Sequence, residues 1–309
     1  MRIVFLGTPE FAVPSLEALV NRGHDVVGVL TQPDRPKGRG GVVAESPVKI
    51  AARRLGIPIH QPERIRRPES VEILRRLAPE MMVVVGYGQI IPQTLIDLPA
   101  YGVLNVHASL LPKYRGAAPI QWAIANGETE TGVTIMQIDA GLDTGDILLQ
   151  RSTPIGPDET APELAARLAY LGAELLIEAI DQIANGTAHP KKQDEQQATY
   201  APLLKKEDGR VDWTRPAGSI YNRLRGFTPW PGAYTTFRGQ QLSILAAKPA
   251  GPDSIPPGVL QVQKGHLLVG CGDGSMLELL EVQPAGRKPM SAQAFMNGYR
   301  IAENEKLGD

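Results

Sequence analysis

The sequence predicts an α/β protein, with a Rossmann-like doubly wound parallel sheet followed by a small β-barrel of the oligonucleotide-binding (OB-like) type. Short, fully apolar runs such as Met81 to Val85 are typical of parallel strands covered on both faces. These runs alternate with segments of helical spacing, as in doubly wound folds. Beyond residue 205 the apolar runs are short, and Gly, Pro and Asp separate them, which indicates a small barrel.

The first half of the chain is expected to alternate strands and helices. Strands are expected at 3–7, around 28–30, and at 57–60, 81–85, 103–107 and 133–138, and helices at 14–21, 46–55, 68–77 and 161–184. In such sheets ligands bind beyond the carboxyl ends of the strands. We therefore expect Gly86 to Gly88, Asn105 to His107 and the loop from Asp139 to Asp143 to meet at one edge.

The chain is expected to have three parts. Residues 1–188 form the first domain, 189–205 a linker, and 206–309 the barrel domain. The linker is predicted because Lys191 to Gln197 is polar and has no apolar period. In the barrel domain a helix is expected at 217–225, with strands at 233–237, 241–247, 258–262, 266–270 and 276–282.

Composition excludes several classes of protein. The 309 residues carry a formal net charge of −1, so the charge as a whole indicates no polyanionic partner. A single cysteine, Cys271, excludes an internal disulfide framework and a Cys-rich zinc site, and no spacing of the histidines indicates a metal. No run approaches the roughly 20 apolar residues of a membrane span. A soluble, cytoplasmic protein is expected, with a monomer as the default.

The most informative residues are Asn105 and His107, together with Asp143 in a Gly-rich loop. Side chains two apart on a strand project from the same face, about 6 to 7 Å apart. An amide donor beside an imidazole suits a reaction in which negative charge builds on oxygen while a proton moves, and a carboxylate can orient the imidazole. The trio predicts acyl transfer without a metal or a covalent nucleophile. The alternative is that Asn105 and His107 only close the end of a strand and that Asp143 caps a turn.

Further motifs accompany this trio. They are Phe5-Leu6-Gly7-Thr8-Pro9, Thr31 to Pro36 with Gly38-Arg39-Gly40, Asn105 to Gln121, Thr131 to Asp146, Pro229-Trp230-Pro231 and Pro284-Ala285-Gly286. With these motifs the sequence resembles the methionyl-tRNA formyltransferases over essentially its whole length. The Asn-x-His pair with a later Asp is shared by the wider family of folate-dependent formyltransferases, so it indicates the reaction class. The remaining motifs indicate the acceptor.

The resemblance implies transfer of a formyl group from the co-substrate 10-formyltetrahydrofolate to the α-amino group of methionyl initiator tRNA, which gives N-formylmethionyl-tRNA for translation initiation. Residues 1–188 would then be the catalytic domain. The neutral amine attacks the formyl carbon, and Asn105 and protonated His107 would donate hydrogen bonds to the resulting oxyanion. Asp143 would orient His107 and could relay the amine proton through water to the departing N10 atom.

The resemblance also implies a folate site. Ser109, Leu110, Leu111 and Pro112 would form one wall of the pocket, and the backbone around Gln89, Ile90 and Ile91 would contact the pterin ring. Apolar walls with fixed backbone groups suit a flat heterocycle. A simple packed turn at 110–112 is the alternative.

The implied tRNA contacts lie in two places. Segment 34–54 sets six basic residues against Asp34 and Glu45, namely Arg35, Lys37, Arg39, Lys49, Arg53 and Arg54. Arg39 is the expected reader of the acceptor end, although Gly41-Val42-Val43 stands where lysines commonly follow in the family, which predicts a weaker hold on phosphate. The other expected tRNA contacts are Lys205, at the end of the linker, and Lys206 and Arg223 in the barrel domain. Trp213 and Trp230 are expected in the core.

Two other functions stay open on the sequence. One is formyl transfer to an amino-sugar nucleotide, since such enzymes share the chemistry and also append a small barrel. The stretches Gly116 to Gln121 and Ile135 to Asp143 favour the tRNA enzyme over it. The other is a folate- or RNA-binding module without catalysis, against which the complete trio argues.

Overall fold

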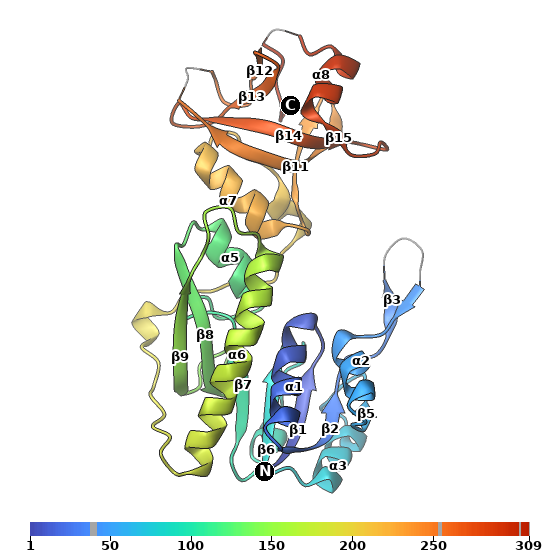
Figure 1. Ribbon diagram of the computed structural model, residues 1–309, viewed down its shortest axis with the longest axis vertical. Helices are drawn as coiled ribbons and strands as arrows, with labels where there is room; N and C mark the ends of the chain where they lie inside the picture. The colour runs from blue at the N-terminus through green and yellow to red at the C-terminus, as the bar shows by residue number, and fades with distance from the viewer. Residues whose placement is uncertain (38–41, 253–254, 303, 309) are drawn as a thin grey trace. The chain divides into compact units, whose positions relative to one another are not determined.

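The computed structural model describes residues 1–37, 42–252, 255–302 and 304–308 (Figure 1). The chain divides into two compact units. Unit 1 comprises Met1–Pro119, Glu130–Pro154 and Ala165–Ala201, and unit 2 comprises Ile120–Thr129, Ile155–Leu164 and Pro202–Asp309. Two segments of unit 2 therefore come from within the first 188 residues.

Unit 1 contains a seven-stranded sheet in the order β5-β2-β1-β6-β7-β8-β9. Its strands are β1 (Arg2–Gly7), β2 (Asp25–Leu30), β5 (Ile59–His60), β6 (Met81–Val85), β7 (Val103–His107), β8 (Glu130–Gln137) and β9 (Ile147–Pro154). The pairs from β5 to β7 are parallel, which confirms the Rossmann-like prediction. The two pairs β7–β8 and β8–β9 are antiparallel.

The prediction that 133–138 forms a further parallel strand is therefore wrong in direction. Six residues of β8 are buried in succession, as in a parallel strand. An apolar run reports that a strand is covered on both faces, and it carries no information on direction. As a result, the loop after β8 leaves the sheet at the end opposite to the carboxyl end of β7.

Helices cover both faces of the sheet in unit 1. They are α1 (Val13–Asn21), α2 (Pro47–Arg54), α3 (Pro68–Leu77), α4 (Gln93–Ile96) and α6 (Ala161–Ala184), and a short hairpin of β3 (Arg35–Lys37) and β4 (Val42–Ala44) precedes α2. Leu74 of α3 and Leu95 of α4 pack in one core cluster with Val4, Met82 and Val103. Figure 1 shows α6 beside β7, and an added Cβ on Gly172 of α6 would lie 2.7 Å from a Val106 methyl group. Glycine thus allows a close approach of this helix to the strand.

Unit 2 contains a second sheet in the order β10-β11-β14-β13-β12, with β15 (Met290–Ser291) paired to β14. The strands are β10 (Ala233–Phe237), β11 (Gln240–Ala250), β12 (Leu260–Gln263), β13 (His266–Gly270) and β14 (Met276–Pro284), with helices α7 (Ala217–Phe227) and α8 (Ala292–Tyr299). All five expected strands and the expected helix are confirmed. Their apolar side chains form a single core cluster that includes Trp213, Leu277 and Phe295.

The C-terminal residues join the two outer strands of this sheet. Gly308 donates a backbone hydrogen bond to the carbonyl of Thr236 in β10, while Leu260 in β12 donates one to the carbonyl of Glu305. Leu307 also pairs with Phe237 and donates to Gly258. The barrel is thus closed by the end of the chain, which satisfies backbone groups that an open edge would expose.

Helix α7 explains why 120–129 and 155–164 belong to unit 2. The buried Arg225 donates through Nη1 to the carbonyls of Gly156 and Glu159, at 3.1 and 2.9 Å. Trp122, in α5 (Pro119–Ala125), meets Phe227 edge to face with ring centroids 5.3 Å apart. The helix therefore packs on residues far from it in sequence.

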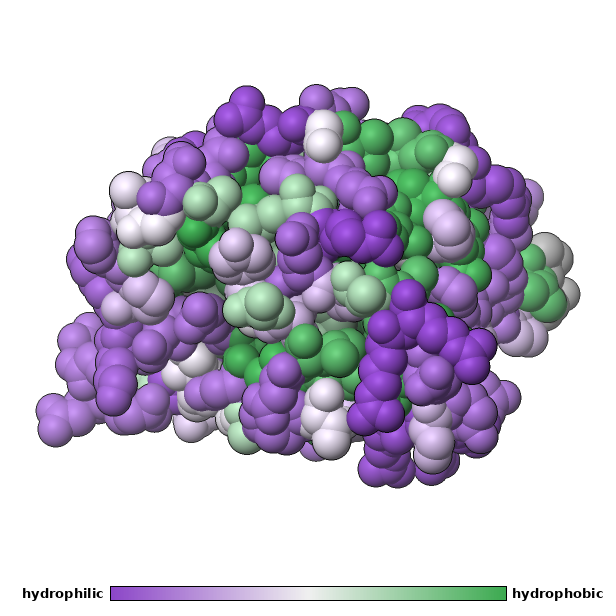
Figure 2. Space-filling view, turned by 90° about the horizontal axis from the view of Figure 1, so that it is seen from below, coloured by the Kyte–Doolittle hydropathy of each residue, from purple (hydrophilic) through white to green (hydrophobic). Residues whose placement is uncertain are grey.

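The visible surface is largely polar. Figure 2 shows hydrophilic side chains over most of one face, with apolar side chains in smaller areas between them. No helix in the described ranges is long and apolar enough to span a membrane.

Two histidines of unit 1 make stability depend on pH. Desolvation by burial lowers the pKa of His24 and of His60 below the ordinary value of 6.5. Within the described chain, the buried Nε2 atoms of both rings lack a hydrogen-bond partner. The folded state therefore favours the neutral rings, and as pH falls through 6.5 the unfolded chain takes up protons first.

We expect the free energy of unfolding contributed by these rings to be present above this pH and to be lost below it. Urea unfolding at about pH 7.5 and about pH 5.5 should show this loss, and His24→Gln and His60→Gln should each reduce it. His189→Gln, at an exposed position, is the matched control. An unchanged pH dependence in both the His24 and the His60 variant would contradict this assignment.

Candidate active site

Asn105 and His107 project from one face of β7. Val103 on the same strand is buried in the cluster with Met82 and Leu95, and alternation places Asn105 and His107 on that face. His107 is buried, whereas Asn105 is half-buried. In the part of the chain that the structure describes, the Asn105 amide makes no hydrogen bond. Its N–H groups are therefore available to a ligand.

The His107 ring is oriented by a backbone carbonyl. Its Nε2 atom lies 2.9 Å from the carbonyl oxygen of Tyr114. A carbonyl only accepts, so Nε2 must carry the proton. The Nδ1 atom lies 3.7 Å from Asp143 Oδ2, which is too long for a hydrogen bond but close enough for electrostatic stabilisation of a charged ring. Sequence patterns do not reveal the Tyr114 partner, because its side chain takes no part in this hydrogen bond.

Asp143 is held by its neighbours in a left-handed backbone conformation, with φ of 53°. The Gly116 N–H donates to Asp143 Oδ2 at 2.8 Å. The amide of Gln193 donates to the carbonyls of Asp143 and Gly145, both at 2.8 Å. The structure thus brings Asp143 to His107 although the loop leaves β8 from the opposite end of the sheet.

The segment expected to be a linker contributes to this arrangement. Lys191 pairs with Ile147 through two backbone hydrogen bonds of 2.8 Å, and Tyr200 is bridged to Arg115. Residues as far as Ala201 belong to unit 1. The polar composition that indicated a solvated linker instead reflects hydrogen bonds of this segment to unit 1.

The turn Ser109 to Pro112 is held by two polar side chains, the buried Thr134 and the exposed Gln150. Thr134 Oγ1 donates to the Ser109 carbonyl at 2.6 Å and accepts from the Leu111 N–H at 3.1 Å. Gln150 Nε2 donates to the Leu111 carbonyl at 2.8 Å. Ser109 and Leu111 are buried, whereas Leu110 and Pro112 are half-buried. Of the four expected folate contacts, only Leu110 and Pro112 therefore have partly exposed side chains that a ligand could reach.

Thr134 and Gln150 face one another across β8 and β9. Neither residue belongs to the site residues that the sequence predicts. The available signal was a single Thr within the apolar run of β8, which is weak because threonine is common in strands.

The expected pterin contacts have separate roles. Gln89 Oε1 accepts from the Ile65 N–H at 2.7 Å, so its side chain supports the neighbouring loop. Ile91 is buried with Val103, and Ile90 is 91% exposed. Leu142, beside Asp143, is also exposed. Exposed apolar side chains and an amide such as that of Asn105 are the kinds of group that a flat, hydrogen-bonding heterocycle requires.

Metal ligands form no cluster in this part of the molecule. Among the described residues, no group of three or more His, Cys, Asp or Glu side chains is placed to hold an ion.

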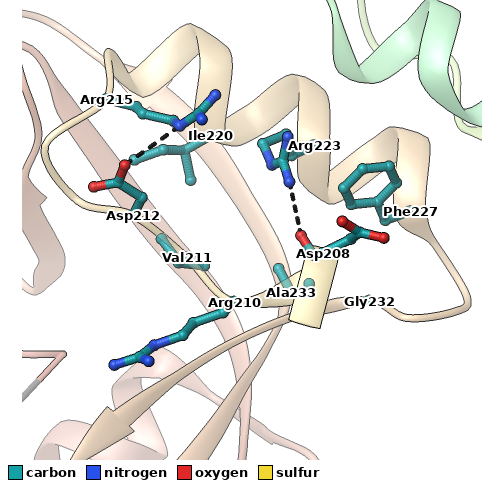
Figure 3. A pocket seen from close by; sticks show the side chains of 11 residues that line it. Asp208, Arg210, Val211, Asp212, Arg215, Ile220, Arg223, Phe227, Gly232 and Ala233 are labelled. Carbon is teal, nitrogen blue, oxygen red and sulfur yellow. Dashed lines mark hydrogen bonds and ion pairs between the residues drawn. The ribbon is translucent and has the colours of Figure 1, made fainter. Parts of the chain in front are cut away.

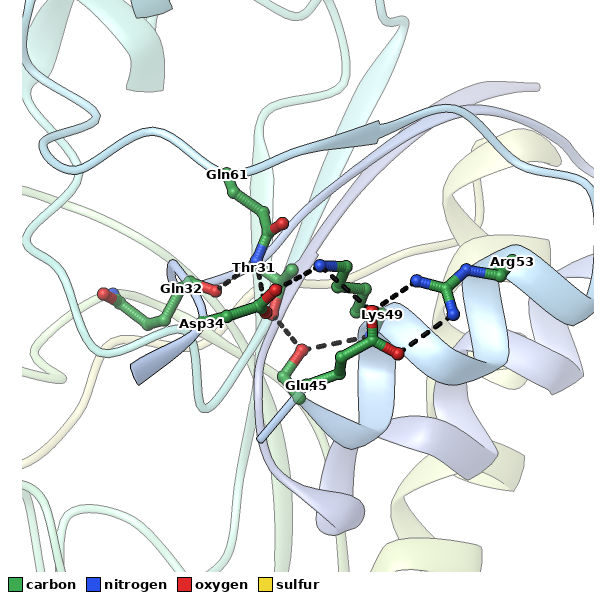
Figure 4. A network of polar contacts seen from close by, with 8 residues as sticks. Thr31, Gln32, Asp34, Glu45, Lys49, Arg53 and Gln61 are labelled. Carbon is green, nitrogen blue, oxygen red and sulfur yellow. Dashed lines mark hydrogen bonds and ion pairs between the residues drawn. The ribbon is translucent and has the colours of Figure 1, made fainter. Parts of the chain in front are cut away.

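The base of the β3–β4 hairpin is tied together by ion pairs (Figure 4). Lys49 pairs with Asp34 and lies 3.3 Å from Glu45, and Arg53 donates to Glu45 at 2.9 Å. Hydrogen bonds from these cations lower the pKa of both carboxyl groups. Arg54 pairs with Glu17. Three of the six basic residues in this segment are therefore already paired with carboxylates.

The expected tRNA reader, Arg39, lies outside the described residues. Of the other hairpin residues, Arg35 is exposed.

In unit 2, Lys205 and Lys206 are exposed, but Arg223 is packed. Its Nη2 atom donates to the Asp208 carbonyl at 2.9 Å, and its guanidinium lies 4.9 Å from the ring centre of Phe227. Figure 3 shows it among the side chains that line a small pocket, with Asp208 and Phe227. Burial lowers the pKa of Arg223. This residue stabilises unit 2 through packing as well as charge.

The two expected core tryptophans differ. Trp213 is buried and donates to Thr235 Oγ1 at 3.1 Å, as predicted. Trp230 is 55% exposed, so its expected place in the core is wrong. It lies between two prolines directly after α7, where the chain turns at the surface. An apolar residue in a turn need not be covered.

Comparison with known proteins is consistent along the whole chain. A family model described as formyl transferase matches residues 1–180, and one described as formyl transferase, C-terminal domain, matches residues 203–300. The methionyl-tRNA formyltransferase of Solibacter usitatus is 62% identical over 311 residues, which cover 100% of this chain and 99% of that protein. The methionyl-tRNA formyltransferase of Koribacter versatilis is 57% identical over 309 residues, with 100% and 99% covered.

Solved structures share the fold. An N-formyltransferase from Helicobacter canadensis, in complex with folinic acid and dTDP-3-aminofucose, aligns with a TM-score of 0.68 at 21% identity, covering 92% of this chain and 99% of that one. HypX from Aquifex aeolicus, in complex with tetrahydrofolic acid, aligns with a TM-score of 0.64 at 19% identity, covering 99% and 48%. On the family models and the full-length relatives, this chain belongs to the formyl transferase family.

Proposed function

We propose that this chain transfers the formyl group of 10-formyltetrahydrofolate to the α-amino group of methionyl initiator tRNA, giving N-formylmethionyl-tRNA. Full-length similarity to proteins named methionyl-tRNA formyltransferase carries the proposal. The arrangement of Asn105, His107 and Asp143 supports the same chemistry. The proposed partners are initiator methionyl-tRNA and the folate donor, which a monomer meets in the cytoplasm, where tRNA is charged.

Asn105 and His107 stabilise the charge that develops on the formyl oxygen as the amine attacks. The Asn105 amide donates directly, since no group among the described residues competes for its N–H. The Nε2 proton of His107 is held by the Tyr114 carbonyl, so the ring donates through Nδ1. A preorganised donor of this kind contributes about 2.7 to 4 kcal/mol to lowering the barrier.

Asp143 stabilises the second proton on the His107 ring. Its Oδ2 atom lies 3.7 Å from Nδ1, so the Nδ1 proton is not already engaged in a hydrogen bond with the carboxylate. The amine must lose one proton, and the departing N10 atom of the folate must gain one. The carboxylate accepts this proton through water and returns it, which balances the reaction.

The first prediction concerns the acceptor. Formyl transfer from 10-formyltetrahydrofolate should be fast with methionyl initiator tRNA and much slower with methionyl elongator tRNA or a dTDP-amino sugar. Radiolabelled formyl incorporation measures all three. Transfer to the sugar alone would keep the chemistry and reject the proposed acceptor.

The second prediction concerns the trio. Asn105→Ala, His107→Ala and Asp143→Ala should each lower kcat, the first by about 100-fold to 1000-fold, because a donor to the developing oxyanion is lost. The midpoint of thermal unfolding should change little. His189→Ala, at an exposed position, is the control for His107→Ala. Near-normal kcat in any of the three would remove that residue from the mechanism.

The third prediction separates tRNA contacts from packing in unit 2. Lys205→Ala and Lys206→Ala should raise KM for tRNA, leave KM for folate unchanged, and each reduce the salt dependence of binding by about one unit of slope. Arg223→Ala should instead lower the unfolding temperature, because its stacking on Phe227 contributes about 1 kcal/mol. An unchanged salt slope in the lysine variants would exclude phosphate contacts there.

A further inference from the structure

Every hydrogen-bonding group of the Gln193 side chain is occupied by unit 1. Its Nε2 atom donates to the carbonyls of Asp143 and Gly145, both at 2.8 Å. Its Oε1 atom accepts from Arg115 Nε at 3.1 Å and from Nη2 at 2.8 Å. An amide has two N–H donors and two lone pairs, so this side chain is fully satisfied. Its orientation is therefore strongly determined.

Arg115 holds the acceptor end of this amide in place. The guanidinium is 1% exposed and forms a two-point ion pair with Glu195, at 2.8 and 2.7 Å. This pairing raises the pKa of Arg115. Its backbone is also paired, since its N–H donates to Thr199 and its carbonyl accepts from Ala201. The Gln193 amide oxygen is thus held by the Arg115 guanidinium, which is itself held by burial and by Glu195.

The backbone that Gln193 grips is strained. Asp143 has φ of 53°, a left-handed conformation that is unfavourable for a residue with a side chain. Such strain persists only where the surroundings impose it. Gln193 holds the backbone on either side of Thr144, while the Gly116 N–H holds the Asp143 carboxylate. Without Gln193 the turn can relax and carry the carboxylate away from His107.

We propose that Gln193 is a positioning residue that keeps the Asp143 carboxylate beside His107 by fixing the 143–145 backbone. The inference rests on the proposed formyl transfer, in which Asp143 supports the charged ring. Among the described residues Gln193 makes no hydrogen bond with His107 or Asn105, so it acts through Asp143. The segment keeps other anchors when Gln193 is replaced, because the backbone pair Lys191–Ile147 and the contacts of Arg115 with Glu195, Thr199 and Ala201 do not involve the Gln193 side chain.

The test uses two substitutions at this position. Gln193→Glu keeps the shape and an acceptor for Arg115 but places a carboxylate oxygen against two carbonyl oxygens. Gln193→Ala removes both the donor and the acceptor for Arg115 without adding charge. We expect both to lower kcat by about tenfold to 100-fold, as for a displacement of about 1 Å. KM for tRNA and for folate should stay within twofold. Gln196→Glu, an exposed change of the same chemistry three residues away, should leave kcat unaltered.

Two measurements separate positioning from a general structural role. In the Asp143→Ala background, Gln193→Ala should lower single-turnover transfer no further, since residues acting as a unit are not additive. In wild-type protein the Gly116 amide donates to the Asp143 carboxylate, so its 1H–15N resonance should shift in both Gln193 variants and not in Gln196→Glu.

The outcomes are distinct. Unchanged kcat in Gln193→Ala, an equal loss of transfer in the Asp143→Ala background, or an unshifted Gly116 resonance would each overturn the proposal. Failure of the wild-type protein to formylate methionyl initiator tRNA would reject the proposed function instead. The Gly116 resonance would still report whether Gln193 positions Asp143, because that measurement does not depend on turnover.

Discussion

The buried guanidinium of Arg115 is the charge on which the arrangement of unit 1 around the trio depends. Leaving a buried charge unpaired costs several kcal/mol, so its donors require partners. Glu195 supplies the opposite charge and Gln193 supplies a neutral acceptor. Both partners come from the segment 191–201, which is far from Arg115 in sequence. Satisfying one cation therefore draws this segment onto unit 1 and brings the Gln193 amide to the Asp143 turn.

The backbone groups on either side of Arg115 hold the His107 and Asp143 side chains. The carbonyl of Tyr114 fixes the ring of His107, and Tyr114 immediately precedes Arg115 in the chain. The N–H of Gly116, which immediately follows Arg115, holds the Asp143 carboxylate. Three consecutive residues thus orient the imidazole, bury the guanidinium and position the carboxylate. The orientations of the His107 ring and the Asp143 carboxylate are thus set by backbone groups on either side of the residue that forms the buried ion pair.

In unit 2 the constraint is different: the outer strands of a small sheet have backbone groups that need hydrogen-bond partners. Its outer strands β10 and β12 are joined by backbone hydrogen bonds from 305–308. Helix α7 adds a second tie, because buried Arg225 donates to two carbonyls in the loop before α6 and Phe227 meets Trp122. Both are contacts between segments distant in sequence. The C-terminal residues consequently belong to the structure of the barrel.

The local pattern of apolar and turn-forming residues was enough to predict most helices and strands of this protein. Burial and turns depend mainly on residues that are close together in the sequence. The helices 68–77 and 161–184, the strand 81–85 and the five strands of the barrel are present as expected. Asn105 and His107 share a face because strand side chains alternate. Three features were decided only by the tertiary structure. They are the antiparallel direction of β8, the closure of the barrel by residues 305–308, and the hydrogen bonds by which Tyr114, Gly116 and Gln193 hold His107 and Asp143. These depend on backbone groups and on pairings across long stretches of chain, and such hydrogen bonds leave no periodic signal in the sequence.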